Sequence, residues 1–332
     1  MAKHVNRRTF LYLASVACLA ALSGCSQNDA SDTTAQTGAD LSRQISVGTL
    51  ATEDILPFWV AESEDLFAQN GLNVSIVPFQ SATELIAGVS SGEVDIAMTD
   101  IMVTAGMFAG GVDVKMIWVT LGTDASQGRF GIMAGPQSEV QELKDLAGVP
   151  IGVGSNTILE YVMDKLMEAA GIPANEIIVE ELQKLPVRYQ AMLSGDVAAA
   201  ALPGTLLALG EANGCKLIAD DTTGDNISQS VMIARNKYAQ DETGQKQIAA
   251  LQEIWDRAAD LINTEPEKYR AVLIEHANLP QEIAETYPIS TYPKAQLPTS
   301  AMVDPVLAWM EQKGYLAKPL EYHESDGTFS AK

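Results

Sequence analysis

Small polar side chains follow four of the strands that this sequence predicts, and these residue types suit hydrogen bonding to a ligand. In open α/β sheets, ligands bind beyond the carboxyl ends of the strands, where helix N-termini expose free N–H groups. The candidate binding residues are Thr49, Thr52, Glu53, Thr99, Asp100, Ser155, Asn156, Thr157, Pro203 and Gly204. We predict that they line the facing walls of one cleft, with segment 155–157 as the first candidate.

The same residues have a second interpretation, because Ser, Thr and Asn also precede most helices as caps. Thr157 and Glu160 fit the Thr-x-x-Glu pattern of a capping box. Capping and ligand contact therefore both stay open for each residue. The fold predicted below favours at least one ligand contact from each wall.

The charge of the ligand is not decided by the sequence. A sulfonate or nitrate would suit helix N-termini and an added arginine. Arg129 and Arg188 are available, although a solvated role is the simpler interpretation of both. Glu53, Asp54 and Asp100 lie on predicted cleft loops, where they would repel an anion and suit a neutral or cationic heterocycle.

Several kinds of chemistry are poorly represented. The sequence predicts no Gly-x-Ser-x-Gly elbow between a strand and a helix, and it contains no Gly-x-x-x-x-Gly-Lys-Ser/Thr phosphate loop. His276 and His323 stand far apart, which disfavours a zinc site. Cys215 would have no partner after Cys18 leaves with a signal peptide and Cys25 is modified, so we expect no disulfide. No cofactor is predicted.

The first residues have the pattern of an export signal. The apolar run 10–22 follows a basic start and is shorter than the roughly 20 residues that span a bilayer. Segment 6–11 also resembles a twin-arginine export signal. Ser23 and Gly24 precede Cys25 as in the bacterial lipobox, in which the cysteine is acylated and becomes the first residue of the mature protein. We predict a signal peptide over 1–24 and lipidation at Cys25.

The net charge argues against a nucleic-acid partner. The chain has a formal charge of −22, and loss of Lys3, Arg7 and Arg8 with the signal would change it to −25. Such a protein repels phosphate backbones. The Ser-, Thr- and Asp-rich segment that follows Cys25 cannot bury a core and is predicted to be a flexible tether.

Strands and helices alternate from Ile45 onward, which predicts largely parallel sheets covered by helices. Strands are expected near 45–49, 74–79, 94–99, 114–120, 151–155, 177–182, 198–202 and 216–219. Helices are expected near 57–68, 82–91, 158–170 and 186–194. Further helices are expected around 248–262, after Thr264 and from Val303.

Two stretches of the chain repeat this order, which indicates two similar α/β lobes. Their matching glycine turns are separated by 106, 100 and 103 positions. Segments 130–134 and 230–234 are also alike, and we interpret them as the crossing strands of a hinge. The predicted division is a tether over 25–43, lobe 1 over 44–133, lobe 2 over 134–231, and a return to lobe 1 with C-terminal helices over 232–332.

These features resemble a known family. Segment 58–74 is similar to the opening of the nitrate/sulfonate/taurine and pyrimidine-precursor (thiamine-precursor) binding proteins of ABC importers. Segments 91–97, 140–148 and 185–203 are similar to later parts of these proteins, so the resemblance covers roughly 44–235. The chain departs at Ala198, where the family usually has Asp, and at 148–150, where a lysine is common.

The resemblance implies a type II periplasmic-binding-protein fold, with two α/β lobes joined by a double-crossover hinge. It implies that a small solute, either a sulfonate, a nitrate-like anion or a pyrimidine/thiamine-precursor heterocycle, binds by hinge closure. The implied partners are an ABC permease and its ATPase, with the membrane reached through the lipid. We expect an extracytoplasmic monomer that is not an enzyme. The alternatives are a ligand-sensing receptor lipoprotein and an enzyme on the same fold.

Overall fold

The computed structural model describes residues 40–332 except 224, 278 and 280. The predicted signal peptide, Cys25 and most of the predicted tether lie outside the described residues. Within the described part, no helix has both the length and the apolar character needed to cross a membrane.

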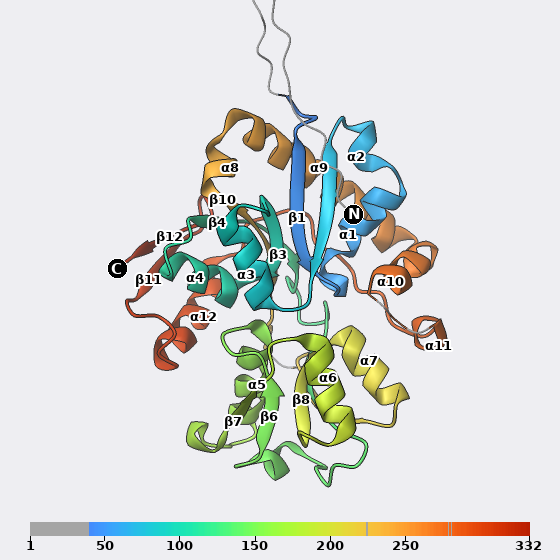
Figure 1. Cartoon of the computed structure of the whole chain (residues 1–332), viewed down its shortest axis with the longest axis vertical. Coiled ribbons are helices and arrows are strands. Elements are labelled where there is room, and N and C mark those ends of the chain that lie inside the picture. Colours follow the sequence, from blue (N-terminus) through green and yellow to red (C-terminus); the bar gives the residue numbers. More distant parts are fainter. Residues whose placement is uncertain (1–39, 224, 278, 280) are drawn as a thin grey trace, which may run out of the picture. The chain divides into compact units, whose positions relative to one another are not determined.

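Two five-stranded sheets form the framework (Figure 1). The first has the order β2-β1-β3-β10-β4 and the second the order β7-β6-β8-β5-β9. The strands of the first sheet are β1 (Gln44–Leu50), β2 (Asn73–Phe79), β3 (Ile96–Asp100), β4 (Val114–Leu121) and β10 (Ser230–Arg235). Those of the second are β5 (Phe130–Ala134), β6 (Pro150–Val153), β7 (Ile178–Glu181), β8 (Ala199–Pro203) and β9 (Lys216–Asp220).

The chain crosses between the sheets twice, and each sheet has one strand that runs against its neighbours. β5 pairs antiparallel with β8 and β9, and β10 pairs antiparallel with β3 and β4. The interpretation of 130–134 and 230–234 as crossing strands is therefore wrong, because each pairs within one sheet. The crossings are segment 122–129 and the described residues of 221–229. The lobe boundaries given above remain predictions, and the strand pairing favours placing β5 in the second lobe.

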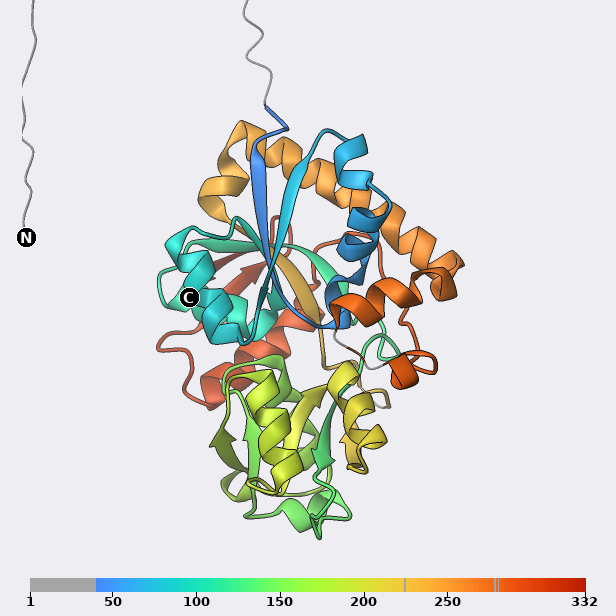
Figure 2. The ribbon, with the colours of Figure 1, turned by 45° about the vertical axis from the view of Figure 1, so that its right-hand side comes forward.

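Helices cover both sheets, as the alternating pattern predicts (Figure 2). The first lobe has α1 (Leu56–Ser63), α2 (Leu66–Gln69), α3 (Ala82–Ser91) and α4 (Ile101–Ala109), and the second has α5 (Ile158–Ala169), α6 (Leu185–Ser194) and α7 (Gly204–Ala212). The helices that follow β10 are α8 (Asn236–Gln240), α9 (Glu242–Thr264), α10 (Arg270–His276), α11 (Gln281–Ala284) and α12 (Ser300–Gln312). Short 3-10 turns are η1 (Glu53–Ile55), η2 (Leu143–Leu146), η3 (Ala174–Glu176) and η4 (Pro266–Tyr269).

The sequence patterns missed some of these elements. The single helix expected over 57–68 is interrupted at Asp65, whose φ of 56° is left-handed and ends the hydrogen-bonding of α1. Helices α4 and α7 were not expected. Neither was the hairpin of β11 (Leu320–His323) and β12 (Thr328–Ala331), whose turn at Gly327 accepts a hydrogen bond from Met116 N of β4.

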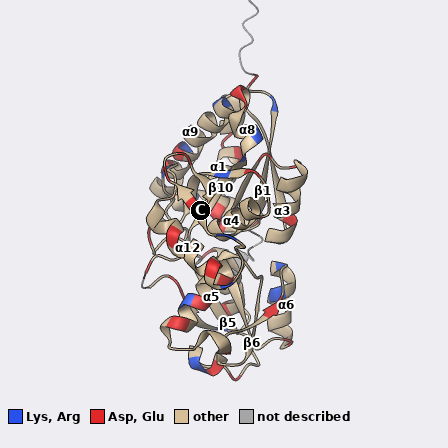
Figure 3. Cartoon of the chain, turned by 90° about the vertical axis from the view of Figure 1, so that its left-hand side faces the viewer, with Lys and Arg blue, Asp and Glu red and all other residues tan. Residues whose placement is uncertain are grey.

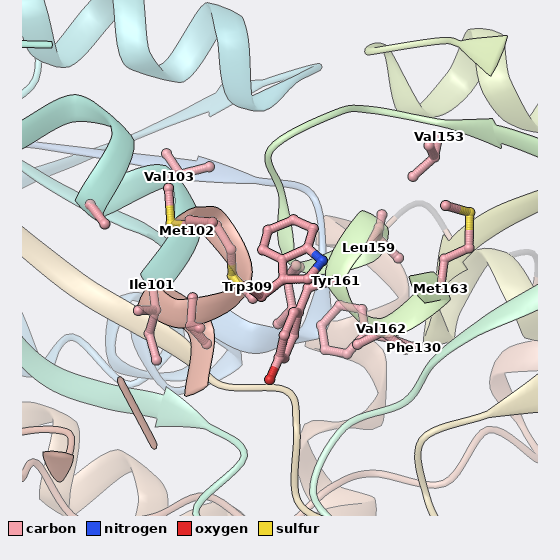
Figure 4. Packing of buried hydrophobic residues seen from close by; sticks show 14 of the residues in the cluster. Ile101, Met102, Val103, Phe130, Val153, Leu159, Tyr161, Val162, Met163 and Trp309 are labelled. Atoms are coloured by element: carbon pink, nitrogen blue, oxygen red, sulfur yellow. The ribbon is translucent and has the colours of Figure 1, made fainter. Parts of the chain in front are cut away.

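One buried apolar cluster runs through both lobes. It joins side chains of β4 and α4 to those of β6 and α5, and Figure 4 shows members from α4, α5 and α12 around Trp309. The ring of Trp309 packs edge-on against the ring of Tyr161, with 5.2 Å between the ring centroids. The Nε1 of Trp309 donates to Asp164 Oδ2 at 2.9 Å. Helix α12 therefore contacts α5 of the second lobe as well as α4 of the first.

Candidate ligand-binding site

The two sheets meet at the carboxyl ends of their parallel strands, and a cavity of about 60 Å³ lies there. Its lining comes from the loop after β1, the start of α3, the ends of β3 and β8, the starts of α5, β5 and β10, and helix α6 with the loop before it. The polar and charged lining residues are Thr52, Asp54, Ser81, Thr99, Asp100, Thr157, Gln183, Arg188 and Ser230. Both lobes therefore contribute to one site, which is the position expected for an open α/β sheet.

Asp100 links the two lobes within this site. Its Oδ1 accepts from Val103 N at 2.7 Å and caps its own helix α4, while its Oδ2 accepts from Ile158 N at 3.0 Å and caps α5 of the other lobe. Burial raises the pKa of Asp100 to about 6, although the two backbone donors act in the opposite direction. The N-termini of α4 and α5 therefore both donate to one carboxylate, whose charged form is partly disfavoured by burial.

Arg188 supplies positive charge from the second lobe. It is 2% exposed, and its Nε, Nη1 and Nη2 donate to the carbonyl oxygens of Leu182, Ala201 and Gln183 at 2.8, 3.0 and 3.3 Å. A guanidinium has five N–H groups, so two have no acceptor among the described residues. Burial lowers the pKa of Arg188 to about 10.

No described carboxylate forms a salt bridge with Arg188, although Glu181 lies near enough to raise its pKa slightly against the effect of burial. A buried cation without a paired anion is unfavourable, and a ligand anion would relieve that cost. Figure 3 shows basic residues, in blue, at the end of α6 that faces the first lobe. The sequence interpretation of Arg188 as a solvated residue is wrong, because α6 packs its side chain inward.

Acidic and hydroxyl groups form the opposite wall of the cavity. Ser230 Oγ donates to Asp54 Oδ1, and Thr52 and Thr99 lie beside this pair. The cavity therefore combines one arginine with two carboxylates, Asp54 and Asp100.

Glu53 lies behind this wall and not in it. Its carboxylate accepts from Tyr287 Oη at 2.8 Å, and its backbone oxygen accepts from Tyr292 Oη at 2.8 Å. Burial raises the pKa of Glu53 to about 8, with a smaller contribution from the charge of Asp54. A Cβ at Gly204 would lie 2.8 Å from Glu53 Oε1 and 2.6 Å from Tyr287 Oη, so glycine permits the second lobe to approach here.

The structure brings half of the predicted binding residues to the cavity. Thr52, Thr99, Asp100, Thr157 and Pro203 are among its lining residues, whereas Thr49, Glu53, Ser155, Asn156 and Gly204 are not. Whether any of them contacts a ligand remains a prediction.

Four of the residues away from the cavity have structural partners or positions instead. Thr49 Oγ1 donates to Leu50 O at 2.8 Å, and Ser155 Oγ donates to Glu181. Asn156 adopts a left-handed φ of 58° at the turn before α5, and Gly204 begins α7.

The predicted capping box at Thr157 is also wrong. Thr157 Oγ1 donates to Gly154 O at 2.7 Å, and Glu160 accepts from Asn156 N at 2.7 Å and not from the N–H of Thr157. Asp100, which is distant in sequence, caps this helix instead. The sequence did not identify Ser81, Gln183, Arg188 or Ser230 as cavity residues. Ser81 is a small polar residue just after a strand, as several of the predicted residues are. Its position in the sequence could therefore have identified it.

The described residues also show where the other sequence features considered above lie. They contain no group of three or more His, Cys, Asp or Glu side chains that could hold a metal ion. Segment 88–92 has the letters Gly-Val-Ser-Ser-Gly, but Ser90 lies in the last turn of α3 and not at a strand-to-helix turn. Cys215 is buried, and burial raises the pKa of its thiol.

Comparison with known proteins identifies the family. A family model described as NMT1/THI5 like matches residues 52–269, and the chain therefore belongs to this family. This confirms the family relationship predicted from the sequence. Among curated protein sequences, none matches this chain.

Solved structures confirm the predicted periplasmic-binding-protein fold. The alkanesulfonate-binding protein SsuA from Xanthomonas axonopodis pv. citri, bound to MOPS, has a TM-score of 0.71 at 17% identity over 83% of this chain and 95% of that one. The periplasmic aliphatic sulphonate-binding protein SsuA from Escherichia coli has a TM-score of 0.68 at 16% identity, over 83% of this chain and 89% of that one. The ligand-binding component of an ABC-type import system from Staphylococcus aureus, with zinc bound, has a TM-score of 0.69 at 14% identity, over 82% of this chain and 92% of that one.

Proposed function

We propose that this chain is the extracytoplasmic solute-binding lipoprotein of an ABC importer. The family, the two-lobed fold and the export signal with Cys25 support this function. Two of the similar structures are of sulfonate-binding proteins, and a third is of a component of an ABC-type import system. The function is binding and delivery, not catalysis.

One observation carries the proposal: both lobes build a single cavity that contains a buried arginine with unused donors. Among the solutes left open by the sequence, this arginine favours an anion such as a sulfonate or nitrate-like group over a cationic or neutral heterocycle. Asp54 and Asp100 then face the solute as acceptors, and a hydrogen-bond donor on the solute would satisfy them. The ligand contacts proposed are those of Thr52, Thr99, Asp100, Thr157 and Arg188.

Ligand binding would favour the closed arrangement of the lobes. A solute that contacts both walls binds the closed form more tightly and shifts the population toward it. We assign the hinge to segments 122–129 and 221–229, where the chain crosses between the sheets. The closed monomer would then deliver its solute to the permease, with the lipid at Cys25 holding it at the membrane.

The experiment measures thermal stability of the full chain with methanesulfonate, nitrate, a pyrimidine and thiamine in turn. A true ligand raises the melting temperature with increasing concentration. We expect an anion to do so, and Arg188→Gln to reduce the affinity at least tenfold, in the range of a lost charge-assisted hydrogen bond. Exposed Arg257 provides the matched control, because Arg257→Gln removes the same charge away from the cavity. An unchanged affinity in Arg188→Gln contradicts the proposed site.

The lipid anchor has a separate test. Mass spectrometry of the protein from a bacterial host should show an acylated Cys25 as the first residue, and Cys25→Ser should release the protein from membranes. An unacylated mature chain would refute the anchor without affecting the solute site.

A further inference from the structure

A cluster of charged and hydroxyl groups outside the cavity joins the C-terminal part of the chain to the second lobe. Lys313 and Tyr315 directly follow α12, and both contact Glu160 in the first turn of α5. Lys313 Nζ lies 2.9 Å from Glu160 Oε1 and 3.0 Å from Asp164 Oδ2. Tyr315 Oη lies 2.8 and 2.7 Å from the two carboxylate oxygens of Glu160. Because α12 also packs on α4, this cluster connects the two lobes at a second place besides the cavity.

Burial makes these carboxylates depend on the contact between the lobes. Glu160 is 1% exposed and Asp164 is 3% exposed. A carboxylate that is removed from water to this extent is unfavourable unless donors or a cation replace the water. Lys313 and Tyr315 supply these groups only while α5 lies against the end of α12. The cluster lies beside the aromatic contact of α12 with α5, so charge and packing act at the same place (Figure 4).

The carboxylate of Glu160 also holds the turn that leads to the cavity. Its Oε2 accepts from Asn156 N at 2.7 Å, and Asn156 has the left-handed φ of 58°, which is uncommon for residues other than glycine. The next residue, Thr157, lines the cavity, and Ile158 N donates to Asp100 Oδ2 of the first lobe. Glu160 therefore fixes a turn whose following residues form the α5 side of the cavity.

We propose that Lys313 and Tyr315 form an interlobe latch on Glu160, and that Glu160 is a positioning residue that transmits this contact to the turn 154–157. Separation of α5 from the end of α12 would deprive Glu160 of both partners, and solvation of its carboxylate would then compete with its hydrogen bond to the turn. The latch presupposes the solute-binding function proposed above and couples closure of the lobes to the shape of the site. Solute affinity then depends on a C-terminal segment that lies outside the cavity lining.

Hydrogen exchange of single amides, measured by NMR on the full chain without solute, tests the latch directly. The amides of Asn156 and Ile158 are informative because each donates to a side chain, that of Glu160 or of Asp100. Tyr315→Phe keeps the ring and removes the hydroxyl that contacts Glu160. It should speed the exchange of both amides about fivefold, in the range of one lost hydrogen bond.

Tyr322→Phe is the matched control. Tyr322 is a buried tyrosine of the C-terminal hairpin, and its hydroxyl donates to Pro298 O at 2.8 Å. This control should leave the exchange of the Asn156 and Ile158 amides within about twofold of the native rates. The amides of α9 in the first lobe report general stability, and they should keep their native rates in Tyr315→Phe.

A second measurement shows whether the latch acts on the site. Nitrate and methanesulfonate are titrated by calorimetry into the native chain, Tyr315→Phe and Tyr322→Phe. An anion that the native chain binds should bind about fivefold more weakly to Tyr315→Phe and with native affinity to Tyr322→Phe. Glu160→Gln provides another variant, because it removes the charge that attracts Lys313, and it should weaken binding in the same direction. The melting temperature without solute shows that each variant is folded.

The possible results separate the latch from the function on which it acts. If Tyr315→Phe leaves both amides at their native rates, or speeds the amides of α9 to the same extent, the latch is overturned and the binding function stands. If exchange rises locally but the affinity for the anion is unchanged, the positioning role of Glu160 is overturned. If neither anion binds the native chain, the proposed anion site is refuted, and the exchange rates alone decide the latch.

Discussion

Replacement of Glu53 by glutamine should remove a large part of the pH dependence of stability. Burial is the main cause of the raised pKa of Glu53, and the charges of Asp54 and Asp221 add to it. The hydrogen bond from Tyr287 and the charge of Arg129 act in the opposite direction. The folded-state pKa of about 8 lies well above the ordinary value of 4.5.

The sign of the effect follows from proton binding. The folded protein retains a proton on Glu53 that the unfolded chain releases above about pH 4.5. The resulting stabilisation is complete below that pH and is lost as the pH rises through about 8. Between about pH 5.5 and about pH 8.5, the contribution of this residue to the free energy of unfolding should fall by about 3 kcal/mol.

Glutamine has nearly the shape of the protonated carboxyl group and does not titrate. The stability of Glu53→Gln relative to the native chain should therefore rise by about 3 kcal/mol between the lower and the higher pH. Urea unfolding at both pH values measures this difference. Exposed Glu62, in the neighbouring helix α1, provides the control, and Glu62→Gln should follow the native pH dependence. If native and Glu53→Gln proteins lose stability equally with rising pH, then Glu53 is ionised in the folded state and the reasoning is refuted.

Two further substitutions test contacts between the lobes. Gly204→Ala would place a Cβ 2.6 Å from Tyr287 Oη, so it should separate the lobes and weaken solute binding about tenfold without unfolding the protein. The control is Gly110→Ala, whose Cβ would meet only α4 backbone oxygens at 3.3 and 3.4 Å and should leave solute binding unchanged. Calorimetry measures the affinity of both variants, and small-angle scattering measures the separation of the lobes. Lys313→Met removes the partner of two buried α5 carboxylates at 2.9 and 3.0 Å and should cost about 3 kcal/mol in urea unfolding, against at most about 0.5 kcal/mol for the surface pair of Lys165. Equal Kd values for the two glycine variants, or equal costs for the two lysine variants, would contradict these expectations.

The alternation of short apolar runs and glycine-ended helices was enough to predict the layered α/β fold, and the resemblance of particular segments indicated the family. Such patterns are local: Gly92 and Gly195 each end a helix with a φ of about 82–83°, where a side chain would be strained. Strand burial on both faces also leaves a local signature, because the fully buried β8 has no polar side chain.

The positions of the crossings could not be predicted in the same way. Segments 130–134 and 230–234 have similar sequences because each is a fully buried strand, and a buried strand does not reveal which sheet it joins. The pairing partners are distant in sequence, and only the assembled sheets select them.

The sequence by itself determined most of the elements, the two-lobed class and several of the strand ends that line the cavity, because each depends on residues that are close along the chain. The tertiary structure decided which of those residues face the cavity. It turned Arg188 inward and placed Asp100 at the N-terminus of a helix 58 positions away. It also withdrew Glu53 behind Tyr287. The physical reason is that burial and charge pairing depend on what the opposite lobe supplies, and no pattern within one lobe contains that information.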